Sequence, residues 1–334
     1  MISESEIGIH VIHEPAILRA FVQSLTHSPL AGGIGRTSVW EPAMNTANFP
    51  LMPAADADYI LLPIAVSCLE ITDWPVYGGL SERGCLLASK VIEDALADAV
   101  ASLHQFSDRP ERLVFLQFGD YADPFEPLSS GIVMKVSAKL NTPRCIVLPY
   151  YLEEFGWRLE QIRARPIDLC TQDFSFLGDL GNGSVRRAIP AAAEALKLRN
   201  YRGSINSVGY HDRQASDRER YIATLDSSCF ILCPRGIGLN SLRFFETLAF
   251  GRIPVLLADN ARLPLDWIID WNSFVVRVPE TEIDRIADYI ETFLAFTSLE
   301  EAAARARQAW EEHLTLANTG ALIRKSLMNL DCCS

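Results

Sequence analysis

The sequence predicts an α/β fold of two domains, each built on a parallel sheet. The chain has 334 residues, which fits about two domains of roughly 100–200 residues each. Short, continuous apolar runs recur along it, and such runs are typical of strands covered on both faces. Amphipathic stretches at helical spacing alternate with these runs, and this alternation indicates βα units with parallel strands.

The first half of the chain shows four strand signals and one long helix signal. We expect strands at residues 59–66, 113–118, 131–136 and 145–148, and a helix at 81–103. The segment 151–172 is less regular, so the domain boundary is placed there. These patterns predict an N-terminal domain over residues 1–160.

A second alternation of strands and helices follows and predicts a C-terminal domain over residues 161–314. Gly251 stands where a left-handed helix cap is favoured. Separately, we expect Trp267 and Trp271 to pack in the core. We expect strands at 174–177, 229–233 and 253–257, and helices at 185–198, 218–225, 241–250, 282–296, 299–314 and 320–330.

Composition excludes several function classes. The formal net charge is 30 − 42 = −12, which argues against nonspecific nucleic-acid binding, because that needs a clustered basic surface. No apolar run approaches the ~20 residues that span a bilayer, and the N-terminus is acidic where a signal peptide is basic. The eight cysteines form no Cys-x-x-Cys pair, so no metal site is expected. We expect a cytoplasmic protein with no transmembrane segment; peripheral membrane association stays open.

The most informative segment is residues 229–246. In it a strand runs into a Gly-containing loop and then into a helix that begins at Asn240 or Ser241. The free amides at a helix N-terminus carry positive dipole character and suit an anion such as a phosphate. In open parallel sheets, ligands lie beyond the carboxyl ends of the strands, which is where this loop stands.

Three charged residues in this segment extend the anion-site interpretation. Arg235 and Arg243 add donors and positive charge, and Glu246 shares a helix face with Arg243. A carboxylate beside a phosphate site is well placed to accept hydrogen bonds from ribose hydroxyls. The alternative is an ordinary loop with a surface Arg–Glu pair.

A linked set of residues in the second half resembles the exostosin-type (GT47-like) glycosyltransferases. Weaker resemblance extends upstream to residues 55–63, 113–120 and 145–150, and to 174–178 with Arg186 downstream. The sequence departs from the family motif where Ile231 and Arg252 replace cysteines. The matching residues are Ser228, Phe230, Leu232, Pro234, Arg235, Gly236, Ser241, Arg243, Phe244, Glu246, Gly251, Ile253, Pro254, Val255, Leu263, Pro264, Asp270 and Trp271.

The resemblance implies a GT-B fold, in which two Rossmann-like domains face an interdomain cleft and the last helix, residues 315–334, returns to the N-terminal domain. It implies an inverting, metal-independent transfer from a nucleotide sugar, UDP-linked, to a glycan hydroxyl in polysaccharide or glycoconjugate biosynthesis. No cofactor is required. Arginines would stabilise charge on the leaving diphosphate. The implied donor contacts are Arg186, toward the diphosphate, and Arg235, Gly236, Ser241, Arg243 and Glu246.

An inverting transfer needs a general base near the acceptor hydroxyl. We expect it at the end of an N-domain strand, and Asp120, which follows the strand at 113–118, is the first candidate. Glu70 is the second, with Asp73 and Asp123 as further alternatives. Each of these acids is otherwise a solvated loop residue or a helix cap.

Two other functions fit the same fold. One is a noncatalytic glycan- or nucleotide-binding protein, against which the retained charges of Arg235, Arg243 and Glu246 argue. The other is a nucleotide-sugar epimerase or hydrolase.

Overall fold

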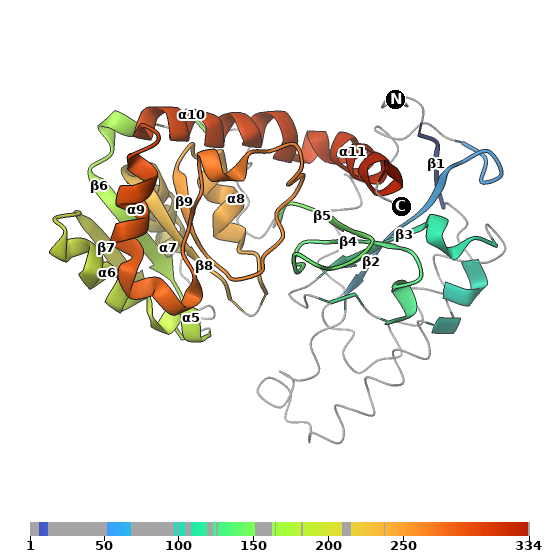
Figure 1. The fold of residues 1–334 in the computed structure, drawn as a ribbon, viewed down its shortest axis with the longest axis horizontal. Coiled ribbons are helices and arrows are strands. Elements are labelled where there is room, and N and C mark those ends of the chain that lie inside the picture. Colours follow the sequence, from blue (N-terminus) through green and yellow to red (C-terminus); the bar gives the residue numbers. More distant parts are fainter. Residues whose placement is uncertain are drawn as a thin grey trace, which may run out of the picture. The chain divides into compact units, whose positions relative to one another are not determined.

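The chain divides into two compact units, each with its own parallel sheet. The computed structural model describes residues 7–12, 52–67, 97–98, 100–103, 108–118, 123–124, 126–150, 162–163, 165–181, 183–208, 215–236 and 238–332. Unit 1 comprises Met1–Leu148 and Leu316–Ser334, and unit 2 comprises Pro149–Thr315. Within the described residues each unit holds one five-stranded sheet whose strand pairs are all parallel (Figure 1). The predicted α/β class with two parallel sheets is confirmed, whereas the arrangement of two sheets around a cleft stays a prediction.

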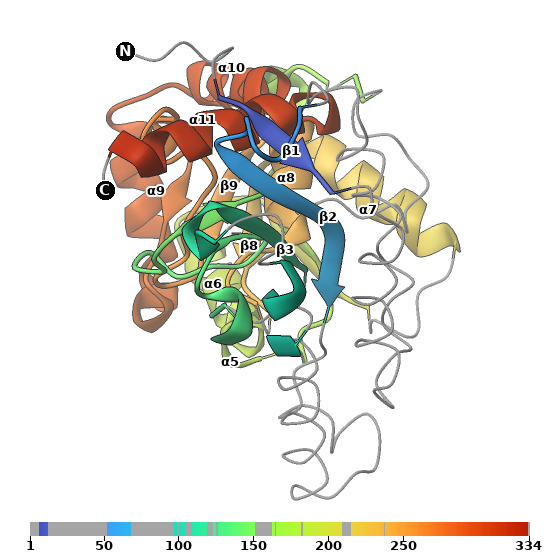
Figure 2. The same cartoon turned by 90° about the vertical axis from the view of Figure 1, so that its right-hand side faces the viewer.

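The sheet of unit 1 has the order β1-β2-β3-β4-β5. Figure 2 shows β1 lying along β2, and the register of the two strands pairs Ile9 with Tyr59. The register of β2 on β3 shifts between Leu61 and Ala65, an interval that contains Pro63, which has no N–H to give to the ladder. Helix α11 (Thr319–Cys332) packs against β5. The strands are β1 (Ile9–Val11), β2 (Tyr59–Ser67), β3 (Leu113–Phe118), β4 (Ile132–Lys135) and β5 (Cys145–Val147).

The sheet of unit 2 has the order β10-β9-β8-β6-β7. Strand β6 pairs with β7 on one side and with β8 on the other. The chain thus adds β7 to one side of β6 and then crosses to add β8 to the other. The strand order reverses between β6 and β8, and ligands of doubly wound sheets bind at such a reversal. The strands are β6 (Gln172–Gly178), β7 (Gly203–Ser207), β8 (Ser228–Pro234), β9 (Ile253–Leu257) and β10 (Val276–Arg277).

The helices of unit 2 pack on this sheet. Helix α7 contacts β6 and β8, α8 contacts β8 and β9, and α10 packs on α8 and β9. Every residue of β8 is buried, as the continuous apolar run predicts. The helices are α5 (Ser184–Arg187), α6 (Ile189–Leu198), α7 (Ala215–Ser227), α8 (Leu242–Ala249), α9 (Ile286–Leu294) and α10 (Leu299–Ala309).

Short helical turns complete the described elements. Ser298 caps α10 with a capping box, in which the Glu301 N–H donates to the Ser298 hydroxyl at 3.1 Å. Within the described residues, no helix has both the length and the apolarity needed to cross a membrane. The 3₁₀ turns are η4 (Pro110–Arg112), η5 (Glu126–Leu128), η8 (Ile167–Leu169), η10 (Trp271–Ser273), η11 (Glu280–Arg285) and η13 (Leu316–Asn318), and Trp310–Leu314 is a π turn.

Several expected elements differ from the structure. The single helix expected at 185–198 is two helices, α5 and α6, that meet at Ala188; Pro190 lies in the first turn of α6, where its missing N–H costs no hydrogen bond. The helices expected at 282–296 and 299–314 are shorter, because a 3₁₀ turn replaces the start of the first and a π turn the end of the second.

Gly251 confirms its expected role at the end of α8, with φ of +59°. The two tryptophans have different environments. Trp271 is 3% exposed, and its Nε1–H donates to the Pro264 carbonyl at 3.0 Å, so it packs in the core as expected. Trp267 is 39% exposed, so its expected core position is wrong.

Candidate functional site

The candidate site lies at the carboxyl ends of β6 and β8 in unit 2. Strand β6 ends at Gly178 and β8 at Pro234, and the two strands are neighbours in the sheet. The loop after β6 leads to α5, and the loop after β8 leads to α8. Both loops therefore start where the strand order reverses, which is where a ligand is expected.

Arg243, in the first turn of α8, is the central charge of this site. Its side chain is 7% exposed, its Nη2 donates to the Leu177 carbonyl at 2.6 Å, and its Cζ lies 4.3 Å from the centre of the Phe176 ring. Its Nε and Nη1 are buried and have no hydrogen-bond partner among the described residues. Leaving a buried charged donor unpaired is costly. The Nε and Nη1 donors therefore point to a place for an anion, which a guanidinium binds through paired hydrogen bonds.

Glu246 lies one turn further along α8 and is 3% exposed. The Tyr221 hydroxyl, from α7, donates a hydrogen bond to its Oε2. Burial, and then the charge of Glu246, raise the pKa of Tyr221 well above its usual value, so the phenol keeps its proton and remains the donor. Tyr221 thus fixes the orientation of the Glu246 carboxylate. The Tyr221 ring centre also lies 5.8 Å from the Arg243 Cζ.

Arg235, the first residue after β8, is held by an ion pair. Its Nε and Nη2 donate to the two carboxylate oxygens of Glu280, at 2.5 and 2.9 Å, and its Nη1 donates to the Gly236 carbonyl at 3.3 Å. Burial alone would raise the pKa of Glu280, but the hydrogen bonds from Arg235 and from the Asp259 N–H outweigh it and lower the pKa. The charge of Arg235 is therefore directed at Glu280 in this structure.

Arg186 joins the two loops of the site. From α5, its Nε donates to the Arg235 carbonyl at 3.3 Å and its Nη1 to the Asp179 carbonyl at 3.4 Å. Gly183, just before α5, has φ of +96°, a conformation that favours glycine. The structure therefore places Arg186 beside the backbone of Arg235.

Ser241 is the N-cap residue of α8, so of the two expected starts, Asn240 and Ser241, the second is right. Its side chain is 6% exposed and makes no capping hydrogen bond. Gly236 is buried in the same loop. The six residues expected around the donor share one end of one sheet: Arg186, Arg235, Gly236, Ser241, Arg243 and Glu246.

Most candidates for the general base lie outside the described residues, namely Asp120, Glu70 and Asp73. Asp123 is described and belongs to unit 1. Its carboxylate pairs with Lys139 at 2.7 Å, and its carbonyl accepts from the buried Lys135 Nζ at 3.0 Å and from the Gln117 Nε2 at 3.1 Å. These contacts hold Asp123 at the carboxyl ends of β3 and β4.

Sequence reasoning missed Tyr221 and Glu280. Tyr221 stood in a predicted helix, but nothing in the sequence paired it with a residue 25 positions away. Glu280 lies outside the matched motif, 45 positions from Arg235. Both act through tertiary contacts, so an aligned motif alone does not reveal them.

The close approach of Arg243 to β6 yields a first prediction. A Cβ added at Gly178 would collide with the Arg243 Nη2, so Gly178→Ala should displace the guanidinium. Because a charged hydrogen bond is then disturbed, the affinity for nucleoside diphosphates should fall by about tenfold or more. Titration calorimetry measures this affinity. Gly181→Ala is the matched control, because its Cβ would lie 3.2 Å from the Asp179 Oδ1 and away from Arg243. Equal affinities of the two variants would show that Arg243 does not contact the ligand.

Residues 174–293 match the family model of the Exostosin GT47 domain. Over 106 residues the chain is 39% identical to the Exostosin-1 homolog of Caenorhabditis elegans, which covers 31% of this chain and 27% of that protein. It is 28% identical to Exostosin-2 of Bos taurus over 119 residues, a match that covers 36% of this chain and 16% of that protein. A probable glucuronoxylan glucuronosyltransferase of Arabidopsis thaliana is 34% identical over 71 residues, and this match covers 21% of this chain and 16% of that protein. The matched segments thus span less than a third of each relative.

Two solved structures resemble the whole chain loosely. A glycosyltransferase from Rickettsia africae has a TM-score of 0.40 at 12% identity and covers 97% of this chain and 98% of that chain. WaaG, a glycosyltransferase involved in lipopolysaccharide biosynthesis, has a TM-score of 0.39 at 11% identity. The match covers 96% of this chain and 99% of that chain.

Proposed function

We propose that this chain, whose residues 174–293 match the model of the exostosin GT47 domain, is a glycosyltransferase that moves a sugar from a nucleotide donor to a glycan hydroxyl. The observation that carries the proposal is Arg243. It is a buried guanidinium with two nitrogens that have no partner among the described residues, at the strand reversal where such sheets bind nucleotides. The family name supports the reaction class, and the site supports a diphosphate as the group bound.

The donor diphosphate would lie against Arg243 and the amides at the start of α8. As the bond between the sugar and the β-phosphate breaks, negative charge builds on the leaving diphosphate. A preformed guanidinium stabilises that charge without having to reorganise. This chemistry supports the metal-independent mechanism that the family resemblance implies.

Two further side chains would position the donor. Glu246, oriented by Tyr221, would accept hydrogen bonds from the ribose hydroxyls. Arg235 would reach the diphosphate only by exchanging its ion pair with Glu280, so the negative ligand and the Glu280 carboxylate compete for one cation. The donor is proposed to be UDP-linked, and the acceptor a growing polysaccharide or glycoconjugate.

The transfer itself would be a single displacement with inversion. A carboxylate takes the proton of the acceptor hydroxyl, the oxygen forms a bond to the anomeric carbon, and the nucleoside diphosphate leaves from the opposite face. Asp120 is the proposed base and Glu70 the alternative, both from the N-terminal half.

The test is the release of nucleoside diphosphate by the full chain, with and without a panel of glycan acceptors. We expect release from a UDP-sugar only when an acceptor is present, at a rate that falls in Arg243→Met and persists in Arg187→Met. Release without any acceptor would instead identify a hydrolase. Binding of the nucleotide with no release under either condition would identify a noncatalytic protein.

A further inference from the structure

A pair of thiols lies at the amino ends of β6 and β8, the opposite ends from the candidate site. Cys170 follows the turn Ile167–Leu169 and precedes β6, and Cys229 is the second residue of β8. The two strands are neighbours, with Gln172 opposite Ser228. The pairing of these strands therefore brings together two cysteines that are far apart in the sequence.

The contacts of the two sulfur atoms place them side by side. The Cys170 Sγ donates to the Asp226 carbonyl at 3.9 Å, and the Cys229 Sγ donates to the Ile167 carbonyl, three residues before Cys170, at 3.9 Å. Each thiol also shifts the pKa of the other, so the two sulfurs lie within interacting distance. Both cysteines are free; Cys229 is buried and Cys170 is partly exposed, so only Cys170 meets solvent readily.

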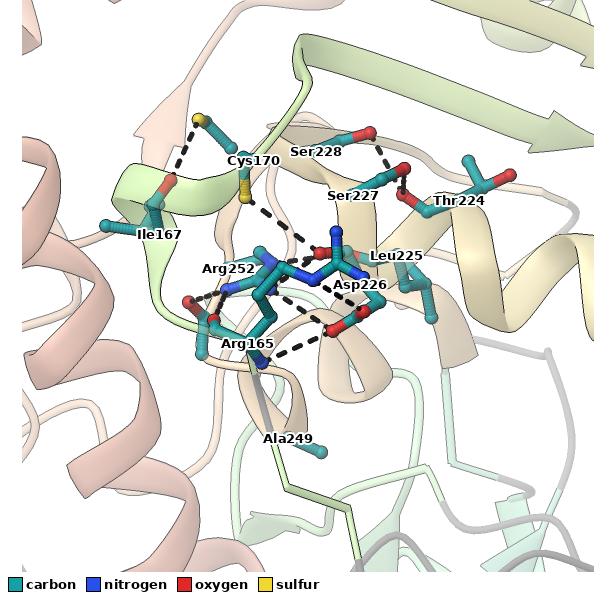
Figure 3. Close-up of polar contacts among 12 residues, drawn as sticks. Arg165, Ile167, Cys170, Thr224, Leu225, Asp226, Ser227, Ser228, Ala249 and Arg252 are labelled. Atoms are coloured by element: carbon teal, nitrogen blue, oxygen red, sulfur yellow. Dashed lines mark hydrogen bonds and ion pairs between the residues drawn. The ribbon is translucent and has the colours of Figure 1, made fainter.

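Arg252 supplies a fixed positive charge beside the pair. Its side chain is 1% exposed, and Figure 3 shows its guanidinium enclosed by main-chain carbonyls. It is the residue that stands where the exostosin motif has a cysteine. Its donors reach the carbonyls of Leu225 at 3.1 Å, Arg165 at 2.8 Å, Asp226 at 2.7 Å and Gly251 at 3.3 Å.

This environment separates the two thiols chemically. Interaction with the Cys229 thiol, and then the charges of Arg252 and Arg165, lower the pKa of Cys170 to about 7, against the opposing effects of burial and of Asp226. The pKa of Cys229 is raised, first by its interaction with Cys170 and then by burial, with Asp173 adding to the rise. A partly exposed thiolate beside a protonated partner thiol is the arrangement of an oxidation-sensitive cysteine and its resolving cysteine.

We propose that Cys170 and Cys229 form an oxidation site, at which a peroxide converts the two thiols into a reversible intramolecular disulfide. The Cys170 thiolate attacks one oxygen of hydrogen peroxide, the O–O bond breaks, and hydroxide leaves and is protonated to water. Conversion of Cys170 to the sulfenic acid removes the neighbouring thiolate that holds the Cys229 proton in place. The Cys229 sulfur then attacks the Cys170 sulfur, the S–O bond breaks, and a second water leaves with the Cys229 proton. The two sulfurs lose two electrons in total, and the peroxide gains them.

Cys233, on the same strand, provides an internal control. It is fully buried, its Sγ contacts the Ile231 carbonyl at 3.3 Å and the Thr247 hydroxyl at 3.6 Å, and burial raises its pKa to about 12. A thiol in this environment stays protonated and unreactive at neutral pH. Oxidation should therefore select Cys170 over Cys233.

The test treats the full chain with hydrogen peroxide, alkylates the remaining thiols and maps the tryptic peptides. We expect a linked pair of peptides, 164–186 with 221–235, that has lost the mass of two hydrogen atoms and is restored by a thiol reductant. Because residues 221–235 contain both Cys229 and Cys233, fragmentation must place the link, and Cys233→Ser should retain it. The link should form faster as the pH rises from 6 to 8, because the Cys170 thiolate fraction rises over that range.

Two serine variants separate the roles of the two thiols. Cys229→Ser should stop at a sulfenic acid on Cys170, trapped by dimedone, and Cys170→Ser should give no link. Thermal unfolding curves that match the wild type would show that both variants fold. The proposal is overturned if Cys170 and Cys229 both remain alkylatable after peroxide treatment of the folded wild type, or if the link joins Cys229 to Cys233.

Discussion

Arg243→Met is expected to lower the affinity for nucleoside diphosphates by about thirtyfold or more, which corresponds to about 2–5 kcal/mol for the loss of one partner from a buried charged contact. Methionine keeps an apolar chain against the Phe176 ring, so this contact is largely retained. What is lost is the guanidinium whose Nε and Nη1 have no partner among the described residues. Titration calorimetry with UDP, GDP and ADP measures the change.

Two further variants sharpen this result. Arg243→Lys keeps the charge but not the planar fork, so its affinity should fall between those of the wild type and the methionine variant. Arg187→Met is the matched control, since Arg187 is exposed on the neighbouring helix α5 and, among the described residues, hydrogen-bonds the Gly181 carbonyl at 3.4 Å. Unchanged affinity in Arg243→Met would remove Arg243 from the donor site.

Arg252→Ala is expected to destabilise unit 2 by about 3–5 kcal/mol, because the substitution removes a buried charge that satisfies several main-chain carbonyls. The carbonyls of Leu225, Arg165 and Asp226 would lose their donor together. Arg252→Cys, which restores the residue of the family motif, should be nearly as destabilising, since a thiol donates one weak hydrogen bond.

Urea unfolding monitored by circular dichroism measures this loss. Arg199→Ala is the control, because Arg199 is about half exposed and pairs with Asp288 and Glu291 at the surface, where such pairs contribute less than about 1 kcal/mol. Arg252→Ala with a midpoint equal to that of Arg199→Ala would contradict a stabilising role for the buried guanidinium.

The strands that the sequence predicts are those formed by continuous apolar runs. Residues 59–66, 113–118 and 229–233 are long apolar runs, and each lies within a strand of the structure. The strands β1, β7 and β10 were missed, because they are short and include polar residues such as Asn206 and Arg277. Such strands are stabilised by pairing with distant segments, which local patterns do not register.

The sequence predicted the part of the candidate site whose residues lie on one continuous strand–loop–helix segment. Arg243 and Glu246 fall in the first two turns of α8, so strand, loop and helix signals suffice to place them. The ion pair of Arg235 with Glu280 and the hydrogen bond of Tyr221 to Glu246 depend on how α7 and the segment after β10 pack. The domain boundary expected at residue 160 differs from the division after Leu148 for a related reason, since contacts rather than composition define the units.

The most direct test of the central claim is a thermal-shift measurement of the full chain against nucleotide sugars and free nucleoside diphosphates. A ligand that binds the native state raises the melting temperature by mass action. We predict that one nucleotide series, expected to be UDP and its sugars, raises the Tm of the wild type and of Arg187→Met but not of Arg243→Met. A panel in which no nucleotide raises the Tm, or in which Arg243→Met responds as the wild type does, would contradict the proposed donor site.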